Sequence, residues 1–198
     1  MKHYAIYACV TQHLIFEGSY PTMRHCVEDA VTKNTSLAGA NLSNLDLSNA
    51  SLDGAQLRSA NLSQTNLSGI NLCEADLTGA SLRGCDLTSA CLCESTLAAV
   101  NFADASFNGT LITGAVIESC IFSCPTALTL PFADARLGRN LYMHDNFTPI
   151  DFSAPPVVVT GLPRRLAFFD DHALVGDRVV PLKDRPTAIL AEFCQKYA

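Results

Sequence analysis

The residues best suited to chemistry in this chain are cysteines and carboxylates that recur at an interval of 20. Cys73 and Cys93 are separated by this interval, as are Glu74 and Glu94, and Asp53 precedes Cys73 by the same interval. Thiolates and carboxylates bind divalent metal ions, and two thiols can form a disulfide. Such a set could form a partner-binding or metal-binding face, or simply a ladder of small residues without a role.

What this set lacks argues against a metal. Cys91 lies two residues before Cys93 on the same face. No histidine joins the set, and structural zinc sites usually have tightly spaced ligand pairs. A disulfide between Cys73 and Cys93 would need a geometry that stacked strands seldom supply. We therefore favour the ladder, expect reduced thiols, and predict no metal and no other cofactor.

Catalytic motifs are also missing from the sequence. Asp170-Asp171-His172 lies between two strand-like runs, and clusters such as this one and His144-Asp145 are typical of turns. There is no Ser-x-x-Lys motif, nucleophile elbow or phosphate loop. The sequence predicts a protein that is not an enzyme.

The net charge of −6 lies entirely in residues 35–124, where two arginines face eight acids (2 − 8 = −6), while both flanks are balanced. This argues against direct nucleic-acid binding and favours a neutral or basic partner. The acids are Asp46, Asp53, Glu74, Asp76, Asp86, Glu94, Asp104 and Glu118.

The same segment repeats every five residues, and this repeat must position the candidate residues. A large apolar residue stands at each of 18 consecutive steps of five. The residue two positions before it is mostly small and is alanine nine times. The core ladder comprises Leu37, Leu42, Leu47, Leu52, Leu57, Leu62, Leu67, Leu72, Leu77, Leu82, Leu87, Leu92, Leu97, Phe102, Phe107, Ile112, Ile117 and Phe122.

A period of five excludes a helix, whose period is about 3.6, and the small and large residues two apart indicate an extended segment. Because five is odd, the chain must turn once per unit to keep every large residue inside. A right-angled turn closes a square after four units, so the 18 units predict about 4.5 coils of about 20 residues, stacked at ~4.8 Å over about 22 Å.

The unit resembles that of the pentapeptide-repeat family, written A(D/N)LXX, as in Ala75-Asp76-Leu77-Thr78-Gly79. The resemblance covers about half of the chain, residues 35–124. It implies an all-β solenoid, the right-handed quadrilateral parallel β-helix. Fold alone does not imply function, and most members of the family have none assigned.

The flanks complete the expected domain organisation. Residues 1–34 should form a strand (Tyr4 to Val10) and a helix (Thr22 to Asn34) that caps the first coil. Residues 125–156 should form a degenerate coil or linker, in which Phe132, Leu137, Tyr142, Phe147 and Phe152 keep the phase of the repeat. This continued phase is equally well explained by one more irregular coil and by coincidence.

Residues 157–198 predict a small α+β lobe. Strand-like runs at 157–159, 166–169, 173–175 and 179–182 suggest an antiparallel sheet, and Thr187 to Tyr197 a short amphipathic helix that caps the lobe or forms a homodimer. No apolar run reaches the ~18 residues of a membrane span. The N-terminus has no charged region followed by a long apolar stretch, so we expect no signal peptide. We expect a soluble, cytoplasmic protein.

Two functions fit these residues. The first is a binding or scaffold module that presents mildly acidic faces, such as the column of Asp46, Asn66 and Asp86, to a protein partner. The second is implied by the resemblance: family members that confer quinolone resistance or inhibit DNA gyrase mimic DNA and so inhibit or protect a type II topoisomerase. We favour the first, because eight acids spread over four faces give a weak field that physiological salt screens.

Overall fold

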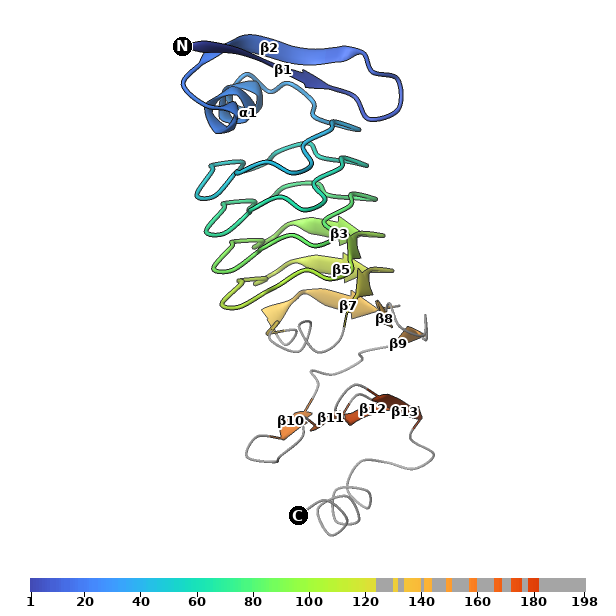
Figure 1. The fold of residues 1–198 in the computed structure, drawn as a ribbon. Helices are drawn as coiled ribbons and strands as arrows, with labels where there is room; N and C mark the ends of the chain where they lie inside the picture. Colours follow the sequence, from blue (N-terminus) through green and yellow to red (C-terminus); the bar gives the residue numbers. More distant parts are fainter. Residues whose placement is uncertain are drawn as a thin grey trace.

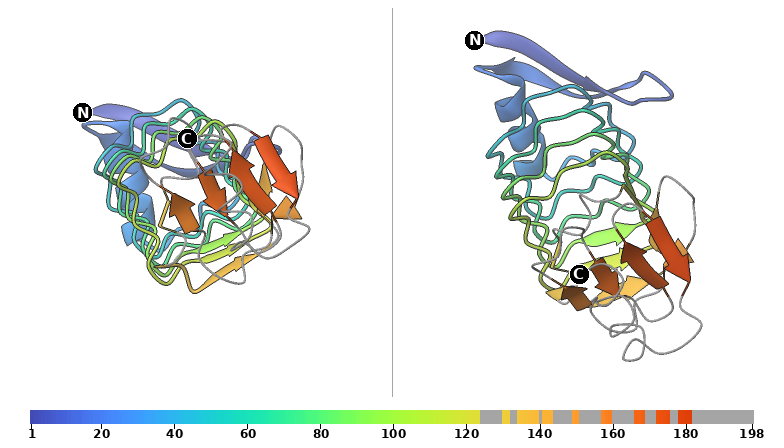
Figure 2. Two further views of the ribbon diagram at one scale, coloured as in Figure 1. Left: turned by 90° about the horizontal axis from the view of Figure 1, so that it is seen from below. Right: turned by 60° about the horizontal axis from the view of Figure 1, so that its bottom comes forward.

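The computed structural model describes residues 1–123, 130–131, 134–139, 141–143, 149–150, 157–159, 166–168, 172–175 and 178–181. A strand hairpin and a helix stand at one end of a stack of coils (Figure 1). Viewed along the stack, successive coils superpose in a four-sided outline (Figure 2, left).

The coils pair in parallel at the predicted interval of 20. Asn41 bridges to Asn61, and Asn61 bridges to Ser81. The Leu62 amide donates to the Ser81 carbonyl at 2.8 Å, and the Asn61 amide donates to the Ala40 carbonyl at 2.9 Å. Where this pairing is longest it forms strands, with β3 (Thr96–Ala98) beside β5 (Val116–Glu118) and β4 (Asn101–Phe102) beside β6 (Ile121–Phe122).

Each corner is made by a residue in the left-handed region of φ. Every residue that stands two places after a core position, from Gly39 (φ 67°) to Ser119 (φ 55°), has a positive φ, and more than half of these residues are not glycine. At most corners a hydrogen bond such as Ala80 N to Leu77 O, at 2.9 Å, closes the turn. A positive φ at the third residue is the mark of a type II turn. One corner per unit and four units per coil give four sides.

The axis is filled by the ladder. Every residue of the ladder is at most 1% exposed, and the alanines of the small position are at most 2% exposed. Phe102 and Phe122 stack with ring centroids 5.1 Å apart. The buried polar residues of the small position donate to backbone carbonyls, as Thr65 Oγ1 does to Leu42 O at 2.7 Å and Thr110 Oγ1 does to Leu87 O at 2.7 Å. The described buried polar side chains all have partners.

The N-terminal segment consists of β1 (Lys2–Tyr7), β2 (Leu14–Tyr20) and α1 (Met23–Thr32). The two strands form an antiparallel hairpin. The strand predicted from Tyr4 to Val10 begins two residues earlier and ends three residues earlier than expected, and its partner β2 was not predicted. The hairpin continues onto the first coil, where the Asn41 amide donates to Tyr7 O at 2.8 Å. Ile6 and Val27 are fully buried in one cluster with Leu37.

After Phe122 the pairing changes register by one residue. β7 (Leu137–Arg139) pairs with β5, and β8 (Leu141–Met143) pairs with β6 and with β9 (Pro149–Ile150). Leu137 stands opposite Val116 rather than Ile117, so the interval is 21 in place of 20 (137 − 116 = 21). The predicted phase of Leu137 and Tyr142 is therefore wrong, because one extra residue precedes them. Phe132, Phe147 and Phe152 lie outside the described residues.

The C-terminal strands form an antiparallel sheet in the order β10-β11-β12-β13, and their bounds agree with the predicted runs to within one residue. They are β10 (Val157–Val159), β11 (Leu166–Phe168), β12 (His172–Val175) and β13 (Arg178–Pro181). The predicted helix from Thr187 to Tyr197 lies outside the described residues. Within the described part of the chain, no helix is both long and apolar enough to span a bilayer.

Candidate functional site: a face of cysteines and carboxylates

One side of the stack collects the predicted cysteines. This side, the cysteine face, consists of residues 51–54, 71–74, 91–94 and 111–114. Parallel bridges join Asn71 to Cys91 and Cys91 to Leu111. The backbone amide of Gly54 donates to the Cys73 carbonyl at 2.8 Å, and that of Glu74 donates to the Cys93 carbonyl at 2.9 Å. The structure thus places Asp53, Cys73 and Cys93 in one column and Glu74 and Glu94 in the next.

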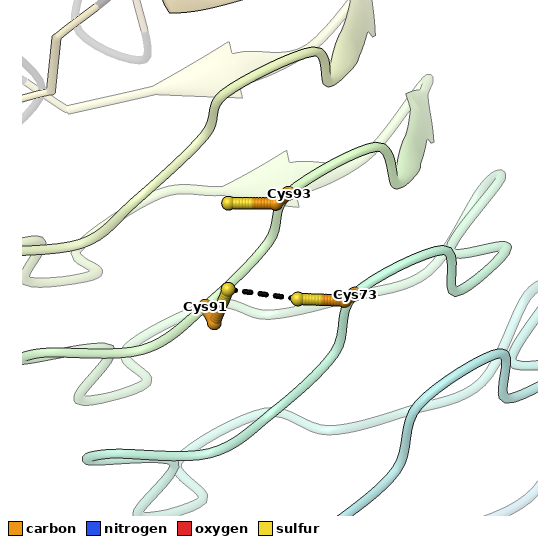
Figure 3. Close-up of side chains that lie close together, drawn as sticks. All are labelled: Cys73, Cys91 and Cys93. Atoms are coloured by element: carbon orange, nitrogen blue, oxygen red, sulfur yellow. Dashed lines mark hydrogen bonds between the residues drawn. The ribbon is translucent and has the colours of Figure 1, made fainter.

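Three thiols meet on this face. The sulfur atoms of Cys73, Cys91 and Cys93 lie within 4.8 Å of one another, and all three residues are partly exposed (Figure 3). Cys91 and Cys93 flank the core residue Leu92, so both side chains leave the strand on its outer side. The pair in direct contact is Cys73–Cys91, with Sγ atoms 2.8 Å apart, rather than the Cys73–Cys93 pair considered from the sequence.

This contact follows a diagonal that recurs around the stack. It joins the residue after a core position to the residue before the core position of the next coil, an interval of 18. Ser63 and Ser81 meet along the same diagonal with hydroxyl oxygens 2.8 Å apart. The diagonal is therefore a property of the coil, and it brings thiols together wherever cysteines occupy both of its ends.

The three thiols differ in acidity. Burial and the hydrogen bond to Cys91 raise the pKa of Cys73 to about 12. The same two causes raise the pKa of Cys93. Burial acts on Cys91 as well, but hydrogen bonds from the Cys73 thiol and from the amide and thiol of Cys93 outweigh it and lower the Cys91 pKa. Cys91 is therefore the first of the three to ionise.

The carboxylates of this face stand apart from the hydrogen-bond network. Within the described residues, the side-chain carboxylates of Asp53, Glu74 and Glu94 make no hydrogen bond or ion pair. The Glu94 carboxylate lies over Gly114, where an added Cβ would collide with it. These three charges are available to a ligand or partner.

The neighbouring side carries the second predicted set. This side, the aspartate face, consists of residues 46–49, 66–69, 86–89 and 106–109. Asp46 Oδ1 accepts from the Ser48 amide at 3.1 Å, and Asp86 Oδ1 accepts from the Thr88 amide at 2.9 Å. Hydrogen bonds from the hydroxyl and amide of Ser48 lower the pKa of Asp46, and those of Thr88 lower the pKa of Asp86. Both carboxylates stabilise local turns and remain ionised.

Negative charge concentrates on these two adjacent faces, which we name together the acidic side. Five of the eight coil acids lie there and neither arginine does (0 − 5 = −5), out of −6 for all the coils. Arg58 pairs with Asp76 at 3.1 Å and Arg83 pairs with Asp104 at 3.3 Å on the other two sides. At the edge of the acidic side α1 adds one base and one acid. Arg24 Nη1 donates to Ser48 O at 2.9 Å, and Glu28 Oε1 accepts from the Ser51 amide at 3.1 Å.

Sequence reasoning missed one residue of the cysteine face. Leu111 is 53% exposed, and it is the one large apolar side chain of the coils, within residues 35–123, with this degree of exposure. It lies beside Cys91 in the next coil. The available signal was its place directly before a core residue, a position that polar side chains fill in most units.

Other candidates cannot be placed. Asp170 and Asp171 lie outside the described residues, as do His144 and Asp145, while His172 begins β12.

A family model described as pentapeptide repeats matches residues 33–64 and 55–92, with eight copies. Among solved structures, the chain is similar to the pentapeptide repeat protein Rfr23 of the cyanobacterium Cyanothece 51142, at 22% identity and a TM-score of 0.42, covering 54% of this chain and 82% of that chain. A pentapeptide repeat protein of the Arabidopsis thaliana thylakoid lumen is 30% identical, with a TM-score of 0.21 and coverage of 50% and 72%. QnrB1, a plasmid-mediated fluoroquinolone resistance protein, is 18% identical, with a TM-score of 0.33 and coverage of 52% and 47%. No curated protein matches the sequence significantly.

Proposed function

This chain belongs to the pentapeptide-repeat family, and from that membership we propose that it is a non-enzymatic module that binds a neutral or basic protein through its acidic side. The observation that carries the proposal is the separation of charge around the coils. Five carboxylates and no lysine or arginine of the coils occupy two adjacent faces, whereas the arginines of the coils are paired on the other two. Arg24 of α1, at the edge of these faces, is offset by Glu28 of the same helix.

The cysteine face supplies the contacts that such a partner would use. Asp53, Glu74 and Glu94 need no internal bond to be broken before they pair with a lysine or arginine. Leu111 adds an exposed apolar side chain on the same face. Interfaces combine buried apolar anchors with charged groups that select the partner and its orientation.

The filled axis supports a role on the outside of the coils. The ladder side chains that would line any internal cavity are at most 1% exposed. A ligand of the coils must therefore bind to an outer face, which suits recognition of a protein better than enclosure of a small substrate.

The test is capture of partners on immobilised full-length protein, followed by titration with the purified candidate. The decisive variant is Asp53→Asn/Glu74→Gln/Glu94→Gln, which removes three charges and keeps side-chain size. Glutamine already occupies an equivalent corner at Gln64, with φ 61°, so the backbone accepts it. We expect at least a tenfold weaker affinity for the true partner and a weaker dependence on salt.

A matched control is Glu118→Gln, which removes one charge from another side of the stack. The control should bind as the unmodified protein does. Equal binding by the triple variant and the unmodified protein would contradict a role for the cysteine face. If Asp46→Asn/Asp86→Asn weakened binding instead, the partner would bind to the aspartate face.

Charge density favours a second candidate, a DNA mimic that inhibits or protects a type II topoisomerase such as DNA gyrase. The five carboxylates of the acidic side fall within three successive coils, a rise of about 9.6 Å from two strand spacings. Duplex DNA carries about six charges over that length, at one per ~1.7 Å. The charge density of the acidic side matches that of DNA only over these three coils, whereas a mimic needs a long continuous surface. Dimerisation through the C-terminal lobe would extend that surface.

Supercoiling, relaxation and cleavage assays with gyrase and topoisomerase IV, with and without a quinolone, separate the two candidates. Inhibition or drug protection at low micromolar protein that weakens in both sets of acid-to-amide variants would establish mimicry. An absence of effect at tens of micromolar would remove this candidate and leave the protein-binding module. Analytical ultracentrifugation would show whether the chain dimerises.

The same proposal covers the finer features of the architecture. It takes the coils as right-handed and about 4.5 in number, counted from the 18 repeat units. It assigns the hairpin and α1 to a cap, and places the protein in the cytoplasm, where thiols stay reduced. Electron microscopy or crystallography of the intact chain and fractionation of the host cell would test these points.

A further inference from the structure

The three sulfur atoms of the cysteine face have the spacing of a metal-thiolate centre. A metal–sulfur bond of about 2.3 Å places two sulfurs of a tetrahedral or trigonal site about 3.8 to 4.0 Å apart. Cys73, Cys91 and Cys93 have ligand atoms that all lie within 4.8 Å of one another. Bringing them onto one ion changes no sulfur–sulfur distance by more than about 1.2 Å, with Cys73 and Cys91 moving apart from their 2.8 Å contact.

The backbone holds these ligands in place before any ion binds. The Cys91 amide donates to Ile70 O at 2.8 Å, and the Glu74 amide donates to Cys93 O at 2.9 Å, so both coils are fixed beside the cluster. Preorganised ligands lose little entropy on binding, which favours affinity. Partial exposure of all three residues leaves the cluster open to an ion from solvent.

Charge on the same face also favours a cation. Asp53, Glu74 and Glu94 contribute three negative charges, and no lysine or arginine of the cysteine face offsets them. Three thiolates would be strongly repelled by these carboxylates unless a cation neutralised them. A bound cation would therefore be attracted by the carboxylates as well as by the sulfurs.

A disulfide fits the same residues less well. Residues joined by this diagonal are separated by one strand spacing of about 4.8 Å and by two residues of about 3.3 Å each along the strand, which puts their Cα atoms about 8 Å apart. A disulfide needs about 4.4–6.8 Å. A disulfide between Cys73 and Cys91 would pull together two coils whose spacing is already set by backbone hydrogen bonds. It would also leave Cys93 without a sulfur partner.

We propose that Cys73, Cys91 and Cys93 form a trithiolate site for a thiophilic metal ion, Cu(I) or Zn(II), on the outer surface of the β-helix. Soft thiolate ligands select these ions over Mg(II) and Ca(II). Three sulfurs complete the coordination of Cu(I), whereas Zn(II) would take a fourth ligand from solvent. Binding exchanges up to three thiol protons for the ion, with no change in oxidation state.

The test uses the full-length protein, reduced and kept free of oxygen. Zn(II) is titrated in competition with a chromophoric chelator, Cu(I) in competition with bicinchoninate, and Cd(II) alone, whose bonds to thiolate absorb in the ultraviolet. We expect one equivalent of ion per chain, a Cd(II)–thiolate absorption of three sulfurs, and no competition from millimolar Mg(II). The Cu(I) and Zn(II) arms show which ion the site prefers.

The variants are Cys73→Ser, Cys91→Ser and Cys93→Ser, each expected to weaken binding at least 100-fold. Serine on this diagonal is compatible with the fold, as Ser63 and Ser81 show, and circular dichroism would confirm that the variants fold. Cys9→Ser is the matched control, because Cys9 is a partly exposed thiol outside the cluster, and it should leave binding unchanged.

Three results would overturn the site: affinity weaker than micromolar for both ions, equal affinity in the cluster variants and the unmodified protein, or loss of binding in Cys9→Ser. The readout is metal stoichiometry, so the outcome is independent of whether the acidic side binds a protein.

Discussion

Two leucines on the cysteine face show how position, rather than residue type, sets the energetic role of a residue. Leu72 is fully buried on the axis, and Leu111 is 53% exposed outside it. We expect Leu72→Ala to lower the free energy of unfolding by about 2–5 kcal/mol, because it opens a cavity in the ladder. Leu111→Ala should change it by less than about 0.5 kcal/mol. Urea denaturation of the two variants measures both, and equal losses would contradict the packing described.

The aspartates of the aspartate face predict how stability responds to acid. Because the folded pKa of Asp46 and of Asp86 is lowered, each stabilises the fold above its unfolded pKa of about 4. This contribution is lost as the pH falls through the folded pKa. We expect Asp46→Asn/Asp86→Asn to lose less stability than the unmodified protein between pH 5 and pH 2.

Asparagine retains the oxygen that accepts the turn hydrogen bonds and already occupies the same column at Asn66. The variant therefore isolates the effect of ionisation. The measurement is the urea midpoint at several pH values. If the two proteins lost stability in parallel, these carboxyls would not be responsible for the acid response.

At the scale of the elements, the corner turn explains the period of five. Ala99 adopts φ 55° at a corner, while its neighbour Ala98 lies in β3. A left-handed conformation costs an alanine about 1–2 kcal/mol, and glycine avoids it at an entropic cost of about 0.5–1 kcal/mol. Ala99→Gly should therefore raise the free energy of unfolding by about 0.5–1 kcal/mol, and Ala98→Gly should lower it by a similar amount. Opposite signs in paired denaturation curves would support this account of the corner.

The elements that the sequence predicted are those with a strong local pattern. The coil was predictable because every unit repeats the same burial, whereas β2 was missed because its residues alternate only between exposed and half-buried. The change of register before Leu137 was hidden because apolar residues continue at intervals of five on either side of it. Only the pairing of Val116 with Leu137 shows the extra residue.

The candidate site was predictable to the same extent. Stacking by 20 placed Cys73 below Cys93 and Glu74 below Glu94. The contact of Cys91 with Cys73 could not be predicted from that interval, because it follows a diagonal between coils with an interval of 18. The interval of 20 identifies residues that stack in one column. It does not identify the Cys73–Cys91 contact, which depends on the direction of the side chains between neighbouring columns.

At the scale of the whole molecule, a stack of coils is stable only if its ends are covered. Val27 of α1 is fully buried against the first coil. We expect Val27→Asp to detach α1, because an unpaired charge cannot remain in that contact, and to expose the edge of the coil to other copies. Light scattering after gel filtration should show oligomers that grow with protein concentration.

Val10→Asp is the control for this variant, since Val10 is 92% exposed. It adds the same charge to the same segment, and its molecular mass by light scattering should equal that of the unmodified protein. A Val27→Asp protein that kept its molecular mass at high concentration would show that the first coil needs no cover.

The corners give the surface of this protein a simple system of coordinates. Because φ, and not residue type, makes each turn, as many kinds of side chain as Asn44, Gln64, Glu74, Ser89 and Ala99 can occupy a corner. Adding 5 to a residue number moves to the next side, and adding 20 moves one step of about 4.8 Å along the axis. The outer residues can therefore be substituted at known positions on the surface, and a new binding surface could evolve or be designed without changing the fold beneath it.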